Sequence, residues 1–202
     1  MALSHLRQQP GIDAKRLVLW GTSFGGGHVV ELAARHADLR GAIAQVPMLN
    51  GRTAVAAVPF SRLLRFGASI AADLLTIGKV VYLPVVAPAG EYATMDRDGA
   101  YAALQSYEQH QGKPLDNRIA ARSLRTMGFY RPLTKLSDVK IPTLLIGATR
   151  DSVAPFVPHA IQKVGNPHLQ VETLDANHFD PYFEPALSQN LGYQLTFLKT
   201  LG

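Results

Sequence analysis

The chain has 202 residues, of which 47% are hydrophobic and 17% charged, a balance that predicts one folded domain and excludes intrinsic disorder. The formal net charge is +5, but the basic residues are scattered rather than gathered in a stripe, so we expect no nucleic-acid partner. Cysteine is absent, which excludes disulfides, thiolate catalysis and cysteine-ligated zinc. No signal peptide is recognised, and a cytoplasmic protein is expected.

Short apolar runs bounded by turn residues alternate with segments of helical spacing. Strands are predicted at 16–20, 41–46, 143–147 and 169–174, and helices at 3–9, 24–37, 156–164 and 187–201. The strands are largely apolar on both faces, although the one at 169–174 is more polar and is expected at a sheet edge. This pattern predicts an α/β fold in which a mostly parallel sheet is covered by helices.

A long insertion, residues 50–131, separates the second and third predicted strands and is expected to be helical, with helices near 60–75 and 98–110. Such insertions often form a cap over the carboxyl edge of the sheet, and an extra packing layer is the alternative. The apolar region 54–89 is broken by charged residues and prolines. No membrane span is therefore predicted, and a surface-lying apolar helix remains open. We expect a single domain, 1–202, with a helical cap at about 50–131.

The sharpest local signal is Gly21-Thr22-Ser23-Phe24-Gly25, a Gly-x-Ser-x-Gly pattern between a predicted strand and a predicted helix. A nucleophile at the tip of so tight a turn has a strained backbone, and we expect side chains two positions either way to collide with the neighbouring elements. Ser23 is the candidate nucleophile, and the backbone N–H of Phe24 is the candidate oxyanion donor. The alternative is a glycine-rich turn that carries an ordinary serine.

A nucleophilic serine needs a base, and the base needs an acid that orients it. Asp151 lies in the loop after the strand at 143–147, and His178 follows the strand at 169–174. Each of the three residues therefore stands at the carboxyl end of a strand. Because these ends meet at one edge of a parallel sheet, we expect Ser23, Asp151 and His178 to converge.

Other assignments compete with this one. Asp175 and Asp180 also follow a strand, but both are too close to His178 in sequence to be the usual orienting acid. The remaining histidines stand on predicted helices or at the starts of elements: His5, His28, His36, His110, His159 and His168. A lone histidine is more often a surface or core residue than a catalyst.

No cofactor is expected. The chain has no His-Glu-x-x-His pattern or comparable cluster of metal ligands. The run Gly25-Gly26-Gly27 lacks both the Lys-Ser/Thr of a P-loop and the glycine spacing of a dinucleotide site.

At these residues the chain resembles the α/β-hydrolase superfamily, in particular bacterial serine hydrolases of the esterase, dienelactone-hydrolase-like and serine-aminopeptidase-like groups. The resemblance is carried by Gly11-Ile12-Asp13 through Gly26, by Ile141-Pro142 through Pro155, and by His178-Phe179-Asp180. It implies acyl transfer to Ser23, with His178 as general base and then acid, and with Asp151 fixing its tautomer. Water then releases the acyl group.

In these families the serine turn follows the fifth strand, whereas only 22 residues precede Ser23 here. The resemblance therefore implies a domain that is incomplete at its N-terminus and lacks the loop that supplies the second oxyanion donor. Losing one such donor typically lowers the rate by about 10²–10³. We thus expect a poorly active chain, and an unpaired sheet edge at 16–20.

The sequence therefore predicts a serine hydrolase that cleaves an ester of a small-molecule acyl substrate. A peptidase or amidase on the same three residues is one alternative, and Glu91 or Asp96 in the insertion would then bind a peptide terminus. An inactive remnant is the other. The oligomeric state is left open.

Overall fold

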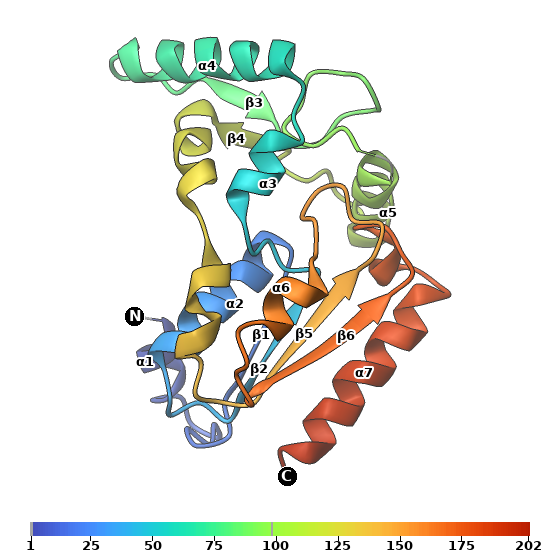
Figure 1. Cartoon of the computed structure of the whole chain (residues 1–202). Helices are drawn as coiled ribbons and strands as arrows, with labels where there is room; N and C mark the ends of the chain where they lie inside the picture. Colours follow the sequence, from blue (N-terminus) through green and yellow to red (C-terminus); the bar gives the residue numbers. More distant parts are fainter. Residues whose placement is uncertain (1, 98) are drawn as a thin grey trace.

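Four parallel strands form the central sheet, in the order β1-β2-β5-β6 (Figure 1). The computed structural model describes residues 2–97 and 99–202, so Asp98, where one expected helix begins, lies outside the described residues. The strands are β1 (Val18–Thr22), β2 (Gly41–Gln45), β5 (Thr143–Ala148) and β6 (Leu169–Leu174). The predicted parallel sheet is confirmed.

The position of each strand follows from its side chains. All residues of β2 and β5 are buried, as apolar runs in the middle of a parallel sheet should be. The two edges are β1 and β6, as expected. The indole of Trp20 on β1 is 55% exposed, so a large apolar side chain remains on this edge of the described sheet.

Helices cover both faces of the sheet (Figure 1). They are α1 (Ala2–Leu6), α2 (Phe24–Arg35), α6 (Pro158–Gln162) and α7 (Ala186–Thr200), with short 3₁₀ helices η2 (Pro132–Asp138) and η3 (Asp180–Tyr182). Because side chains alternate along a strand, Leu145 of β5 packs with α2 and η2 on one face. Its neighbours Leu144 and Ile146 pack against α7 on the other face.

The insertion lies beyond the carboxyl ends of the strands (Figure 1). It contains α3 (Gly51–Ala56), α4 (Phe60–Leu75), α5 (Ala100–Gln111) and the 3₁₀ helix η1 (Ala121–Phe129). It is not helical throughout, because β3 (Tyr82–Pro84) and β4 (Arg118–Ala120) pair antiparallel. These strands are short and far apart in the chain, so local periodicity does not reveal them. No helix in the described part of the chain is long and apolar enough to cross a membrane.

Candidate active site

Ser23 occupies the turn between β1 and α2 in a conformation that L-residues rarely adopt, with φ 53° and ψ −122°. Backbone hydrogen bonds hold it there. The Ser23 N–H donates to the carbonyl of Gln45 at 2.9 Å, and the Ser23 carbonyl accepts from the N–H of Met48 at 2.9 Å. The strain is therefore imposed by the end of β2 and the segment that follows it. Such strain clusters at functional sites.

The glycines around Ser23 do not all serve the purpose expected from the sequence. A Cβ atom on Gly21 would lie 2.5 Å from the carbonyl oxygen of Gly25, so a side chain is excluded there. For Gly25 the expectation is wrong, because its Cβ would meet nothing within 4 Å outside its own helix. The crowded positions are the next two. A Cβ on Gly26 would lie 3.0 Å from Pro47, and one on Gly27 would lie 2.5 Å from the carbonyl oxygen of Met48.

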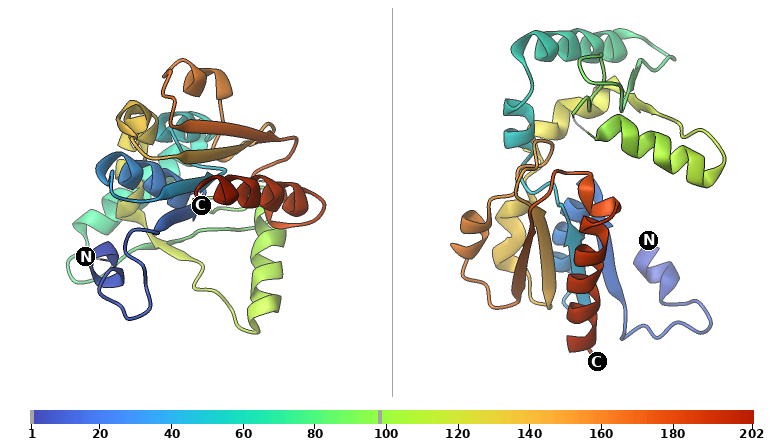
Figure 2. Two further views of the ribbon diagram at one scale, coloured as in Figure 1. Left: turned by 90° about the horizontal axis from the view of Figure 1, so that it is seen from below. Right: turned by 90° about the vertical axis from the view of Figure 1, so that its right-hand side faces the viewer.

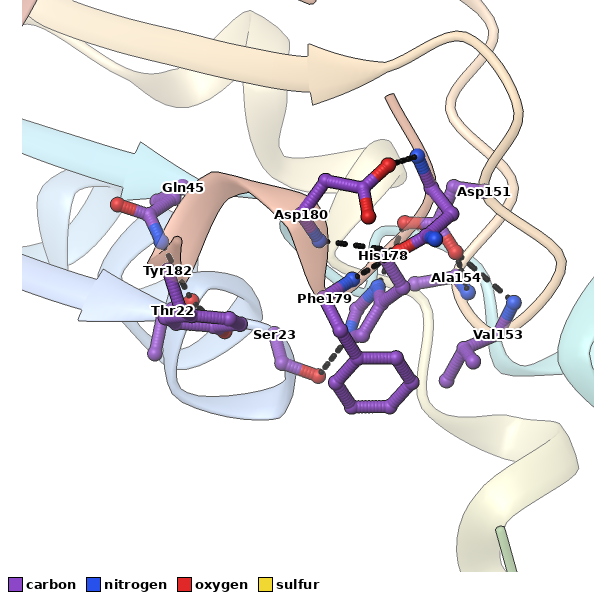
Figure 3. Close-up of polar contacts among 11 residues, drawn as sticks. Thr22, Ser23, Gln45, Asp151, Val153, Ala154, His178, Phe179, Asp180 and Tyr182 are labelled. Atoms are coloured by element: carbon purple, nitrogen blue, oxygen red, sulfur yellow. Dashed lines mark hydrogen bonds and ion pairs between the residues drawn. The ribbon is translucent and has the colours of Figure 1, made fainter. Parts of the chain in front are cut away.

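Three predicted residues from distant parts of the chain form one continuous line of hydrogen bonds (Figure 3). Nε2 of His178 lies 2.9 Å from Oγ of Ser23, and Nδ1 of His178 lies 2.6 Å from Oδ2 of Asp151. Ser23 follows β1, Asp151 follows β5 and His178 follows β6. The parallel sheet thus brings the three groups to one edge.

The surroundings of Asp151 fix the roles of the imidazole nitrogens. Oδ1 of Asp151 accepts hydrogen bonds from the backbone N–H groups of Val153 at 2.8 Å and Ala154 at 2.7 Å. Oδ2 is left to accept the hydrogen bond that the Nδ1–H of His178 donates. Both side chains are buried. Nε2 is therefore the acceptor that faces the Ser23 hydroxyl, which is the tautomer a general base needs.

The loop that carries His178 is held by hydrogen bonds on both sides of the imidazole. Oδ1 of Asn177 accepts from the backbone N–H groups of Phe179 at 2.7 Å and Asp180 at 3.0 Å. Oδ2 of Asp180 accepts from the N–H of Asn177 at 2.7 Å. Asp180 thus shapes this loop rather than contacting the imidazole, which removes it as the orienting acid.

The remaining alternatives lie away from the hydrogen-bonded line. Asp175 is exposed and forms an ion pair with Arg150. His28 lies on α2, where its Nδ1 is 3.1 Å from the hydroxyl of Tyr130. Asp96 forms an ion pair with Arg62, whose guanidinium holds the pKa of that carboxyl below its usual range. The structure therefore does not offer Asp96 as an unpaired acid for a peptide terminus.

Sequence reasoning missed a polar network behind the serine turn. Nε2 of Gln45 donates to Oγ1 of Thr22 at 3.4 Å, and Oε1 of Gln45 accepts from Asn190 at 2.7 Å and Gln194 at 3.0 Å. The Thr22 hydroxyl also contacts the hydroxyl of Tyr182, whose pKa is raised by burial (Figure 3). The i, i+4 spacing of Asn190 and Gln194 on an otherwise apolar helix face is the signal that could have revealed the network.

The backbone N–H of Phe24 stands where the sequence places it, at the first position of α2. A first-turn N–H has no acceptor within its own helix and lies at the positive end of the helix dipole. The Phe24 ring packs against the rings of His28 and Tyr130, with centroids 4.6 Å and 4.7 Å away.

A mainly apolar cavity of about 220 Å³ lies between α5 and the loop that carries His178. Phe179 lines it, and the Phe179 ring centroid is 5.1 Å from that of His178. The other walls are Val85, Val86, Met95, Ala100, Ala103, Leu104, Tyr107, Leu115, Asp116 and Asn117. A larger cavity of about 350 Å³ is lined by residues that precede β1, β2 and β5 and by the end of α7, at the amino ends of the strands, and takes no part in this site.

Among residues 2–97 and 99–202, no three His, Asp or Glu side chains gather closely enough to bind a metal ion. The expectation that no cofactor is needed stays a prediction.

The fold and the serine turn agree with a family of known proteins. A family model described as serine aminopeptidase, S33, matches residues 2–177 and so contains Ser23 and Asp151. The chain belongs to this family. The match ends one residue before His178. The resemblance to the α/β-hydrolase superfamily is therefore confirmed.

Individual proteins extend the comparison. The chain is 31% identical over 203 residues to the quorum-quenching protein AidA of Acinetobacter baumannii (strain MDR-ZJ06), covering 99% of this chain and 66% of that protein. This chain therefore spans just under two thirds of the length of that relative. The α/β hydrolase GrgF from Penicillium sp. sh18 superposes with a TM-score of 0.70 at 21% identity, over 98% of this chain and 68% of GrgF. A monoacylglycerol lipase from Paleococcus ferrophilus superposes with a TM-score of 0.61 at 16% identity, over 99% of this chain and 70% of the lipase. These two structures share the fold.

Proposed function

We propose that this chain is a serine hydrolase that cleaves carboxylic esters through an acyl-enzyme formed on Ser23. The observation that carries the proposal is the line of hydrogen bonds from Ser23 Oγ through His178 to Asp151, at 2.9 Å and 2.6 Å. The strained backbone of Ser23 supports it, because an ordinary turn serine needs no such conformation.

Each group has a defined part in the proposed reaction. Nε2 of His178 takes the hydroxyl proton of Ser23 as Oγ bonds to the ester carbonyl carbon. The negative oxygen that forms faces the N–H of Phe24. When the intermediate collapses, the carbon–oxygen bond of the ester breaks and His178 passes its proton to the departing alkoxide. A water molecule then repeats these steps on the acyl-enzyme and releases the acid, while Asp151 stabilises the imidazolium.

The cavity beside Phe179 supports a small or medium apolar acyl group as part of the substrate. Its lining is mainly apolar and includes Phe179, whose ring packs edge-on against the imidazole of His178. The name of the relative that is 31% identical adds quorum quenching as a candidate role for this chain. If the cavity takes the acyl chain, Leu104→Trp should fill it and shift preference towards shorter esters. Gln105→Trp, at an exposed position on the same helix, should leave chain-length preference unchanged.

A fluorophosphonate probe tests the nucleophile directly. The purified chain should be labelled, with the adduct mapped by mass spectrometry to the peptide that contains Ser23, and Ser23→Ala should not be labelled. Labelling that persists in Ser23→Ala would place the nucleophile elsewhere. A folded wild-type chain that resists the probe would contradict the proposal and favour an inactive remnant.

Amide hydrolysis is the second candidate, because the matching family is described as a serine aminopeptidase. The ion pair between Asp96 and Arg62 weakens it, since Asp96 is not available to bind a substrate ammonium. The exposed Glu91 is the remaining acid from the sequence prediction. Comparing p-nitrophenyl esters with aminoacyl p-nitroanilides separates the two. Faster turnover of the anilides, lost in Glu91→Gln, would favour the peptidase.

A further inference from the structure

The outer face of α4 is apolar. Figures 1 and 2 show α4 at the end of the molecule farthest from the central sheet, with β3 and β4 on its inner side. Phe60, Leu64, Leu74 and Leu75 share the outer face, since they are spaced by multiples of about one helical turn. The side chains of Phe60 and Leu75 are 74% and 82% exposed. The residues between them on this face are small: Gly67, Ala68 and Ala71.

The inner face of α4 is occupied by contacts of its own. Phe66 is buried in a cluster with Leu83 and Ala121. Asp73 is buried, and Arg122 donates to both of its carboxylate oxygens. A surface helix ordinarily turns its polar side chains away from such contacts. On α4 the side turned away carries no charged residue, and the apolar surface continues past the helix to Ile77, which is 98% exposed.

The segment that carries α4 is basic. From the start of α3 to the end of β3, residues 51–84, the basic residues are Arg52, Arg62, Arg65 and Lys79, and the single acidic residue is Asp73. Asp73 is neutralised by Arg122, and Arg62 by Asp96. Within the described part of the chain, Arg52, Arg65 and Lys79 form no ion pair. The guanidinium of Arg65 lies over the ring of Tyr92, 3.9 Å from its centroid.

We propose that the outer face of α4 docks on an anionic phospholipid surface. An interfacial helix of this kind inserts its apolar side among the acyl chains, while flanking Lys and Arg side chains meet the phosphate groups. A second copy of this chain suits the face less well, because it would bring two copies of the same basic segment together. The net charge of +5 also favours an anionic partner. Docking does not depend on the proposed hydrolase activity, because α4 does not carry Ser23.

Sedimentation with lipid vesicles tests the proposal. The chain should bind vesicles of phosphatidylcholine and phosphatidylglycerol, and bind vesicles of phosphatidylcholine alone much more weakly. The double variant Leu64→Ser, Leu75→Ser should lower the partition coefficient by at least about tenfold, because two large apolar groups no longer enter the lipid. The matched control is Leu191→Ser, Leu195→Ser, which changes two exposed leucines of α7 and should bind as the wild type does.

A charge variant and a solution measurement complete the test. Arg65→Gln, Lys79→Gln should weaken binding to the anionic vesicles by about tenfold and leave the residual binding to neutral vesicles unchanged. Absence of binding by the wild type, or equal loss in the α7 control, would overturn the proposal. A dimer in analytical ultracentrifugation that Leu64→Ser, Leu75→Ser dissociates, without vesicle binding, would assign the face to a second copy instead. Ser23→Ala should bind vesicles normally even if the hydrolase proposal fails.

Discussion

Replacing Asp151 with Asn changes one oxygen to an NH2 group and should abolish most activity without disturbing the packing. Oδ1 of Asp151 accepts two backbone N–H groups, from Val153 and Ala154. An asparagine that turned its NH2 group towards them would leave two buried donors without acceptors, at a cost of about 1–3 kcal/mol each. The asparagine oxygen therefore stays with the backbone, and the NH2 group faces His178.

That orientation forces the wrong tautomer on the imidazole. An NH2 group can only donate, so Nδ1 of His178 must accept and Nε2 must carry the proton. Nε2 then points a hydrogen at Ser23 Oγ, 2.9 Å away, and cannot act as the base. Comparable changes in serine hydrolases lower kcat by about 10⁴, which corresponds to about 5.4 kcal/mol in activation free energy. We expect a loss of about 10³–10⁴ here.

The assay is the second-order rate constant for fluorophosphonate labelling, with ester hydrolysis as a second readout. The matched control is Asp175→Asn, which changes the exposed acid nearest in sequence to His178 and should alter the rate by less than about fivefold. Asp151→Asn with a rate within about tenfold of the wild type would refute the assigned tautomer and the role of Asp151. So would a larger loss in the control than in Asp151→Asn.

Three further predictions concern the scaffold of the site, with the free energy of unfolding in urea as the measurement. Ser23→Gly should stabilise the chain by about 1–3 kcal/mol relative to Ser23→Ala, because glycine accepts the positive φ without strain; equal stabilities would contradict this. Gly21→Ala should destabilise the chain by at least about 1–3 kcal/mol, whereas Gly25→Ala should be neutral or stabilising. A larger loss of stability in Gly25→Ala than in Gly21→Ala would contradict the assignment of the crowded glycines. Gln45→Leu should lower the free energy of unfolding by about 1–3 kcal/mol for each polar partner left unsatisfied. The control Gln170→Leu, at an exposed position, should lower it little. Equal stabilities of the two variants would mean that the network adds no stability.

The sequence by itself determined the strands of the central sheet, the main helices and their order along the chain. The mostly apolar runs at β2 and β5 predict buried strands, because strands covered on both faces of a sheet carry mainly apolar side chains. The positions of Ser23, Asp151 and His178, each just after a parallel strand, then predict that they meet, since the carboxyl ends of parallel strands share one edge of the sheet. Helix α4 and strand β6 have the predicted bounds because the residue pattern within each segment is enough to set them.

Only the tertiary structure decided three further features of the insertion and the serine turn. The pairing of β3 with β4, the network from Gln45 to Asn190, and the reassignment of the crowded glycines from Gly25 to Gly26 and Gly27 all depend on contacts between segments far apart in the chain. No local pattern encodes those contacts, because they are fixed by how the layers pack rather than by the spacing of residues within one element.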